Sequence, residues 1–193
     1  MNANQLPLER HPWPPYIPNG SRYLFLGTFP PKPIRWSMPF FYPNPINDFW
    51  RVMGILFYDD RDALWLKDDK RFDLNAIKAF LDREKIAMWD TAMVVRRLKD
   101  NASDKFLEIV EPINLEALLD DHPTITTVIT TGEKATAVIA AQANIDVPSI
   151  GRPVNCHIGV HDIMLWRMPS TSRAYPLSLE KKAAAYRMVF DCQ

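Results

Sequence analysis

Residues 41–50 combine aromatic rings, prolines and uncharged amides, among them Asn47, in a spacing that could hold a flat ring beside a polar group. They follow an apolar run and the turn that ends it, in which Phe29 lies. Phe29, Phe41 and Tyr42 could form the faces of a pocket, and Tyr42 is the best candidate because its phenol gives an aromatic wall a polar edge. Ordinary core packing is the alternative for these rings.

A second set of polar residues, 170–173, comes directly after a predicted strand. Ser170, Thr171 and Ser172 offer small hydroxyls and backbone donors, and Arg173 adds a positive charge. This composition suits the binding of phosphate oxygens. A cap-rich loop that leads into the last helix has the same composition, so the sequence alone leaves both interpretations open.

Four apolar or β-branched runs predict the strands that position these residues. They are residues 23–26, 86–89 and 124–130 and a strand within 157–168. Helical spacing predicts helices at about 45–57, 74–84, 115–119 and 133–143 and a last helix after Ser178. Because strands alternate with helices, we expect an α/β fold, a three-layer α/β/α sandwich around a central, mainly parallel four-stranded sheet.

Ligands of such sheets bind beyond the carboxyl ends of the strands. The loops expected at that edge are residues 27–31, 90–97, 131–133 and 168–173. The aromatic and polar residues described above lie on or near the first and last of these loops, and Thr131 lies on the third. The order of elements therefore predicts one site made from segments that are far apart in the sequence.

Length and composition predict one compact domain. The chain has 193 residues, of which 47% are hydrophobic, with 23 basic and 23 acidic side chains. We expect residues 1–20, which contain five prolines, to be an irregular extension that packs through Trp13 and Tyr16, and residues 21–193 to form the domain. Because the charges balance, any surface for an anionic polymer must be a local patch.

The cysteines, Cys156 and Cys192, show no Cys-x-x-Cys spacing, so we expect a reducing compartment and no disulfide framework. The sequence contains no apolar run long enough to cross a membrane and no signal-peptide pattern at its start. His157 and His161 are four residues apart, but Gly159 argues against a helix that would bring them to a metal. No metal and no nucleotide cofactor is predicted.

Several short motifs occur in one order along the chain. They are residues 42–50 (YPNPINDFW), 87–90 (AMWD), 101–104 (NASD) and 168–174 (MPSTSRA). In this order they resemble the uracil-DNA glycosylase superfamily, and the first and last of them look most like its hypoxanthine-DNA glycosylase branch. Each motif is weak alone, and the shared order over most of the chain makes the resemblance specific.

The resemblance implies a DNA glycosylase that hydrolyses the N-glycosidic bond of a deaminated base, hypoxanthine or uracil, in base excision repair. Such an enzyme needs no cofactor, and its partner is DNA that contains a damaged base. We expect it to work as a monomer in the cytoplasm, associated with the nucleoid. The roles that the resemblance implies are catalysis for Asn47, a base pocket for Phe29, Phe41, Tyr42 and Thr131, and DNA binding for Ser170, Thr171, Ser172 and Arg173.

Asn47 has a side chain that fits the chemistry of glycosidic hydrolysis. The reaction passes through an oxocarbenium-like sugar, which needs an oriented water on one side and a stabilised leaving base on the other. A carboxamide can orient a water and direct its dipole toward the developing positive charge without being a strong base. Taken by itself, an asparagine near a helix start more often makes a local capping bond, and this alternative stays open.

Five positions depart from the family pattern. Phe29 stands where several branches carry an acidic or amide catalytic residue, and Met168 stands where the classical uracil enzymes carry a histidine. Pro31 removes a backbone N–H from the first loop, and Asn44 and Thr131 replace a usual histidine and a common asparagine. Two alternatives therefore stay open, a catalytically weak or inactive nucleic-acid-binding module of the same fold, or a hydrolase of free nucleosides.

Overall fold

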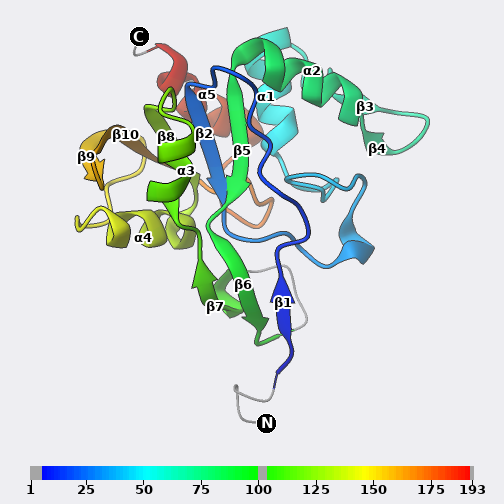
Figure 1. Cartoon of the computed structure of the whole chain (residues 1–193). Helices are drawn as coiled ribbons and strands as arrows, with labels where there is room; N and C mark the ends of the chain where they lie inside the picture. The colour runs from blue at the N-terminus through cyan, green and yellow to red at the C-terminus, as the bar shows by residue number, and fades with distance from the viewer. Residues whose placement is uncertain (1–5, 100–103, 192–193) are drawn as a thin grey trace.

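The computed structural model describes residues 6–99 and 104–191, and its centre is a five-stranded sheet (Figure 1). The strand order is β5 (Ile86–Asp90), β2 (Tyr23–Gly27), β8 (Thr127–Thr131), β10 (His161–Met168) and β9 (Val154–Ile158). The first four strands run parallel, which confirms the four predicted strands. The predicted count of four is wrong, because a turn at Gly159, with a φ of 57° that favours glycine, folds β9 back antiparallel to β10.

Helices cover both faces of the sheet, as predicted for an α/β/α sandwich. The helices are α1 (Phe49–Tyr58), α2 (Leu74–Glu84) and α5 (Leu179–Asp191) on one face, and α3 (Leu115–Asp121) and α4 (Glu133–Gln142) on the other (Figure 1). In β2, Tyr23 and Phe25 belong to the core under α1, α2 and α5, whereas Leu24 and Leu26 belong to the core under α3 and α4. Burial on both faces explains the continuous apolar run in this strand.

Polar side chains begin three of the helices at the predicted places. The carboxylate of Asp73, the amide oxygen of Asn114 and the hydroxyl of Ser178 each accept a hydrogen bond from a backbone N–H in the first turn that follows. Such bonds satisfy N–H groups that have no partner within the helix. These three helix starts are therefore confirmed.

Helix α1 begins later than its sequence pattern predicts. It starts at Phe49 and not at Pro45. A separate turn precedes it, in which the N–H of Asn47 donates to the carbonyl oxygen of Asn44 over 2.8 Å. Asn47 therefore lies in a turn before the helix and not in its first turn.

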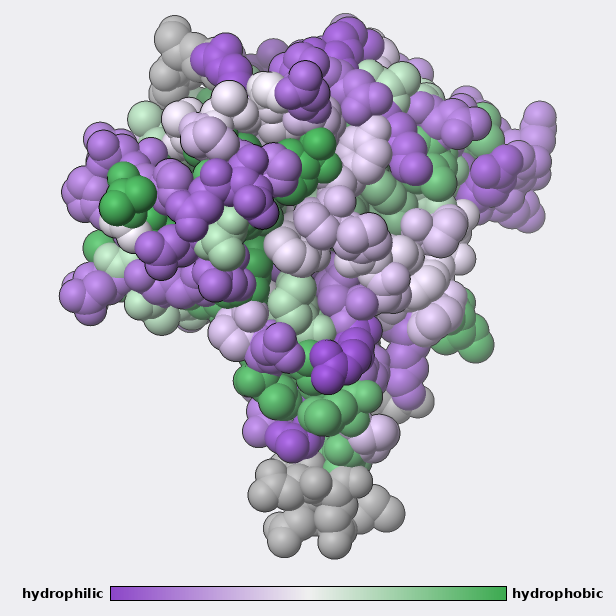
Figure 2. Space-filling model, in the orientation of Figure 1, coloured by the Kyte–Doolittle hydropathy of each residue, from purple (hydrophilic) through white to green (hydrophobic). Residues whose placement is uncertain are grey.

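A second, antiparallel sheet extends from the carboxyl end of β5 (Figure 1). Its strands are β1 (Leu8–Arg10), β6 (Ala92–Arg97) and β7 (Leu107–Pro112), in the order β1-β6-β7. The predictions of an irregular arm at 1–20 and of a loop at 90–97 are wrong for these strands, because β6 follows β5 after Thr91 alone and the arm pairs with β6. Figure 2 shows apolar surface on this sheet, where Val110 is 42% exposed.

Smaller elements complete the described chain. They are the hairpin of β3 (Trp65–Leu66) and β4 (Arg71–Phe72) and the 3₁₀ turns η2 (Pro33–Arg35) and η3 (Asp104–Phe106). Cys156 is a buried free thiol, whereas Cys192 and most of the 101–104 motif lie outside the described residues. In the part of the chain that the structure describes, no helix combines the length and the apolar character that crossing a membrane requires.

Candidate active site at the carboxyl edge of the central sheet

The parallel strands of the sheet end side by side at one edge. Gly27 at the end of β2 lies opposite Asp90 at the end of β5, and Thr131 at the end of β8 lies opposite Met168 at the end of β10. Three of the four predicted loops start from these strand ends, and the fourth continues as β6. The edge therefore collects the segments that carry the predicted site residues.

Asn47 lies in the turn that leads into α1, and its side chain is half-buried. Its Oδ1 accepts a hydrogen bond from the N–H of Phe49 over 2.9 Å, so the local capping bond considered from the sequence is present. An amide oxygen has two lone pairs, and the amide nitrogen carries two hydrogens. The bond to Phe49 thus fixes the orientation of the carboxamide and leaves its oxygen a second lone pair that can orient a water.

The turn before α1 lies against the loop that follows β10. The N–H of Asp48 donates to the carbonyl oxygen of Thr171 over 2.9 Å. The Asp48 carboxylate accepts a hydrogen bond over 2.8 Å from the ammonium of Lys182 on α5. Two segments that resemble the same family, residues 42–50 and 168–174, are therefore in direct contact.

The predicted DNA-binding loop presents some of its side chains to solvent and buries one. The side chain of Arg173 is 54% exposed and Ser172 is exposed, whereas Thr171 is only 2% exposed. The hydroxyl oxygens of Ser170 and Ser172 accept hydrogen bonds from backbone N–H groups two residues later, as expected of a cap-rich loop. Ser172 and Arg173 are therefore exposed and Ser170 is half-buried, while the Thr171 side chain belongs to the interior, and the DNA-binding role of the loop stays a prediction.

Tyr42 and Thr131, two of the predicted pocket residues, are in contact. Their hydroxyl oxygens lie 2.7 Å apart, and the Tyr42 ring stacks on Phe49 with centroids 3.9 Å apart. The backbone φ of Tyr42 is 49°, in the left-handed region that side chains other than those of glycine rarely adopt. Burial, with a further contribution from Asp90, raises the pKa of the Tyr42 phenol well above its usual value. A phenol is protonated at neutral pH even at its ordinary pKa of about 10, so the Tyr42 hydroxyl can donate a hydrogen bond.

Phe41 and Phe29, the other predicted pocket residues, both contact the N-terminal arm. Phe41 is 1% exposed, and its ring packs against the rings of His11 and Trp13. Phe29 is half-buried, with its ring centroid 5.6 Å from that of His11. Core packing accounts for the place of the Phe41 ring, and the pocket role of both residues stays a prediction.

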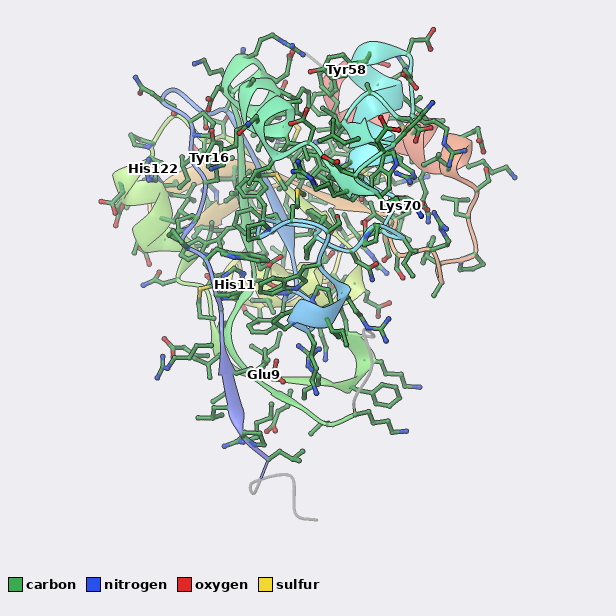
Figure 3. All side chains as sticks on the ribbon, turned by 90° about the vertical axis from the view of Figure 1, so that its right-hand side faces the viewer. Glu9, His11, Tyr16, Tyr58, Lys70 and His122 are labelled. Carbon is green, nitrogen blue, oxygen red and sulfur yellow. The ribbon has the colours of Figure 1, made fainter. Side chains whose placement is uncertain are left out.

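A buried pair of His11 and Asp90 lies at the same edge. Nε2 of His11 is 2.9 Å from Oδ2 of Asp90, and the two side chains are 4% and 9% exposed. The other ring nitrogen lies 2.8 Å from the carbonyl oxygen of Trp13. Figure 3 shows His11 on the arm between Glu9 and Tyr16. Asp90 could have been found as the end of a predicted strand, whereas no pattern in the proline-rich arm marks His11.

Gly27 has no room for a side chain beside this pair. A Cβ at Gly27 would lie 2.4 Å from Oδ1 of Asp90 and 3.2 Å from the Tyr42 hydroxyl oxygen. Asp104 in η3 adds a second carboxylate. Burial raises its pKa above the usual value, a hydrogen bond with Thr28 offsets part of this shift, and Asp90 adds to it. The part of the edge near β2 and β5 is therefore filled with its own polar side chains.

Two surface hollows of the molecule lie away from the convergent loops. The first, of about 430 Å³, is lined by residues of β9 and β10 and by Thr126 and Thr127. The second, of about 390 Å³, lies between the start of α3, Gln142 at the end of α4 and the turn at Gly159. Neither lining includes a residue of the four predicted loops. We place the site at the loops, because ligands of parallel sheets bind at the carboxyl ends of the strands. Within residues 6–99 and 104–191, no three acidic, histidine or cysteine side chains are grouped to hold a metal ion.

Comparisons with known proteins agree with this architecture. No protein-family model matches the chain. A protein named hypoxanthine DNA glycosylase from Methanosarcina barkeri is 28% identical over 129 residues, which are 66% of this chain and 74% of that protein. A proposed uracil DNA glycosylase from Methanosarcina acetivorans, solved by solution NMR, superposes with a TM-score of 0.60 at 18% identity, over 95% of this chain and 99% of that one.

The structural likeness defines the class, a uracil-DNA glycosylase-like α/β fold. The likeness in sequence then confirms the resemblance to the uracil-DNA glycosylase superfamily near its hypoxanthine branch.

Proposed function

We propose that the chain is a DNA glycosylase that hydrolyses the N-glycosidic bond of a deaminated base, hypoxanthine first and uracil second, in base excision repair. The hydrogen bond of 2.9 Å from the Asp48 N–H to the Thr171 carbonyl oxygen carries this proposal. It joins the two segments that look most like the hypoxanthine branch, at the edge where such folds bind ligands. The names of the two similar proteins support DNA as the substrate.

Asn47 orients the attacking water in this proposal. The Phe49 N–H holds the amide oxygen at 2.9 Å, so the amide dipole is already in place when positive charge develops on the sugar. The N-glycosidic bond breaks with its electron pair on the base, the water oxygen adds to the sugar carbon, and the proton released by the water neutralises the base. The Tyr42 hydroxyl donates to an oxygen of the base, and Thr131 can act as the donor in the bond between the two hydroxyls.

The remaining parts of the proposal concern binding and organisation. Ser172 and Arg173 contact phosphates beside the extruded nucleotide. The protein acts as a monofunctional glycosylase without a cofactor, as a monomer on DNA in the cytoplasm. Residues 21–193 form its single domain, and residues 1–20 are an extension that β1 and His11 attach to it.

A gel assay tests the function directly. Duplexes that carry one deoxyinosine, one deoxyuridine or no damaged base are incubated with the protein and then treated with alkali, which breaks the strand at a site that has lost its base. The expected result is more strand breaks in the deoxyinosine duplex than in the deoxyuridine duplex, and none in the undamaged duplex. Release of bases from free nucleosides, without strand breaks, would instead identify a nucleoside hydrolase.

One observation favours a second candidate, a nucleic-acid-binding module of the same fold. The oxygen of Asn47 is already bonded to the N–H of Phe49, and Phe29 and Met168 stand where other branches carry catalytic side chains. A module of this kind binds the duplexes in a mobility-shift assay and leaves every strand intact after alkali. The same set of duplexes therefore separates the two candidates.

A further inference from the structure

Lys182 is a lysine with no exposed surface. It lies near the start of α5, where its Nζ donates to Oδ2 of Asp48 over 2.8 Å and to the carbonyl oxygen of Ser172 over 2.8 Å. Burial of an ammonium is unfavourable unless the charge is paired. An apolar residue would fill this position on the buried stripe of α5 without that cost, so the stability of the core alone does not account for a lysine here.

Asp48 is the residue that receives this charge, and it directly follows Asn47. It occupies the N-cap position of α1, yet its carboxylate makes no capping bond with that helix. An N-cap aspartate usually accepts a hydrogen bond from its own first turn. The Asp48 side chain, which is 9% exposed, instead binds Lys182, and its Oδ1 lies 3.8 Å from the Arg173 guanidinium.

Lys182 and Asp48 together join two segments of the candidate site. Through Asp48 the ammonium holds the turn that carries Asn47, and through Ser172 it holds the loop that offers Arg173 to solvent. The backbone bond between Asp48 and Thr171 runs alongside these contacts. Because Lys182 balances the Asp48 charge, Arg173 can move toward a phosphate without leaving that buried carboxylate unpaired.

We propose that Lys182 is a positioning residue that holds the turn of Asn47 in register with the loop of Ser172 and Arg173. The catalytic meaning of this inference rests on the proposed function, whereas the positioning itself is a property of the fold. A positioned amide keeps the water in one geometry, and a displacement of about 1 Å can lower a rate about 100-fold.

The informative variant is the double replacement Asp48→Leu/Lys182→Met. Lys182→Met alone leaves the buried Asp48 carboxylate with only the Arg173 guanidinium at 3.8 Å and is expected to destabilise the chain. Replacement of both partners of a buried ion pair by apolar residues is often neutral or stabilising. The double variant is therefore expected to keep the fold and the backbone bond from residue 48 to Thr171. It removes the contacts of the Lys182 ammonium with Asp48 and Ser172 and the ion pair of Asp48 with Arg173.

Two measurements report on positioning. Hydrogen exchange at the Phe49 amide, whose partner is Asn47 Oδ1, is expected to become about ten-fold faster in the double variant at unchanged melting temperature. The single-turnover rate of cleavage at saturating deoxyinosine DNA is expected to fall about 100-fold. If Asp48 and Lys182 served only the stability of the fold, the double replacement would change the melting temperature. It would then leave the exchange rate of the Phe49 amide and the cleavage rate unchanged.

Lys134→Met is the matched control. The Lys134 ammonium donates to the backbone carbonyl oxygens of Asp104 and Leu107 and does not contact the turn of Asn47. Exchange at Phe49 is expected to stay as in the parent. The inference is overturned if the folded double variant exchanges Phe49 and cleaves DNA as the parent does. If the parent itself cleaves no DNA, the proposed function fails, and exchange at Phe49 alone decides whether Lys182 positions the turn.

Discussion

The two sides of the carboxyl edge are held together by different chemistry. On the arm side, near β2 and β5, His11 and Asp90 form a buried pair among aromatic rings. On the helix side, Asp48 and Lys182 form a buried ion pair next to the exposed Arg173. The arm side is closed by its own side chains, whereas the helix side reaches solvent. In the proposed function, DNA approaches the helix side and the arm side forms the wall behind the base.

The His11–Asp90 pair and the Asp48–Lys182 pair each connect residues that are far apart in the sequence. His11 and Asp90 are 79 residues apart, and Asp48 and Lys182 are 134 residues apart. The cost of closing a long loop grows only slowly with its length. A few well-made buried contacts can therefore fix the geometry of an edge whose loops come from the whole chain. The following changes, from the largest expected effect to the smallest, test whether the two sides differ as described.

Asn47→Ala is expected to give the largest effect. Loss of a water-orienting group typically lowers a rate by about two to four orders of magnitude, and the fold and the affinity for DNA are expected to persist. Single-turnover cleavage of a deoxyinosine duplex measures the loss. Asn114→Ala is the matched control, because it removes a capping asparagine of α3 that lies outside the edge, and it should cost about 1 kcal/mol of stability while cleavage continues. Cleavage by Asn47→Ala within a few-fold of the parent contradicts the assignment.

His11→Ala tests the arm side. It leaves the buried Asp90 carboxylate without its imidazole partner, and a buried acceptor that loses its hydrogen bond typically costs about 1–3 kcal/mol, with the upper end expected for a carboxylate. Urea unfolding should show this loss in the free energy of unfolding. His161→Ala is the control, since its partner Asp120 has a side chain that is 60% exposed and such pairs contribute about 1 kcal/mol or less. Equal losses in the two variants would show that the arm is not anchored by His11.

Arg173→Ala tests whether the helix side meets DNA. Loss of one phosphate contact should weaken binding to damaged and undamaged duplexes alike and reduce the salt dependence by about one counterion. Arg83→Ala on α2 is the control, because the side chains of Arg83 and Arg173 are both 54% exposed. Affinities measured over a range of salt concentrations give the slopes. An unchanged slope would show that Arg173 does not contact DNA phosphates. A loss of discrimination between damaged and normal bases would assign Arg173 to the base pocket.

Tyr42→Phe gives the smallest effect and probes where the two sides meet. The variant loses the hydrogen bond to Thr131, which is worth about 1 kcal/mol. Burial raises the pKa of the Tyr42 phenol above its ordinary value of 10.0, so above pH 10 the unfolded state binds fewer protons and stability falls as the pH rises.

Because Tyr42→Phe removes the ionisable hydroxyl, stability should fall less steeply with rising pH in the variant, by up to about 1.4 kcal/mol per pH unit. Urea unfolding of parent and variant at pH 8, 10 and 11 measures the slope. Equal slopes would mean that Tyr42 ionises as easily in the folded state as in the unfolded state.

Local signals in the sequence were sufficient to predict much of the fold. The apolar run of β2 and the capping residues Asp73 and Asn114 identified a strand and two helix starts, because each depends on neighbours in the chain. The sheet of β1, β6 and β7 could not be predicted in this way. Strand β1 has three residues, with an exposed-intermediate-exposed burial pattern, and only its pairing with β6 makes it a strand.

The candidate site was predictable in part. The order of the strands placed Thr131 and the loop of Ser172 at one edge, which the structure shows. His11 could not be found, since its partner is defined only by the fold. Lys182 could have been found, because it precedes Tyr186 by four residues and Val189 by seven and so falls on the buried stripe of α5.

The contact between Gly27 and Asp90 has a consequence for how this protein can diverge. A methyl group at position 27 would lie 2.4 Å from the Asp90 carboxylate, so alanine there requires the carboxylate to shift away or residue 90 to become smaller. Such a change would also remove the partner of His11. The three positions are therefore expected to covary, so that homologues with a larger residue at position 27 lack both the aspartate and the histidine, and the composition of the N-terminal arm becomes a marker of lineage.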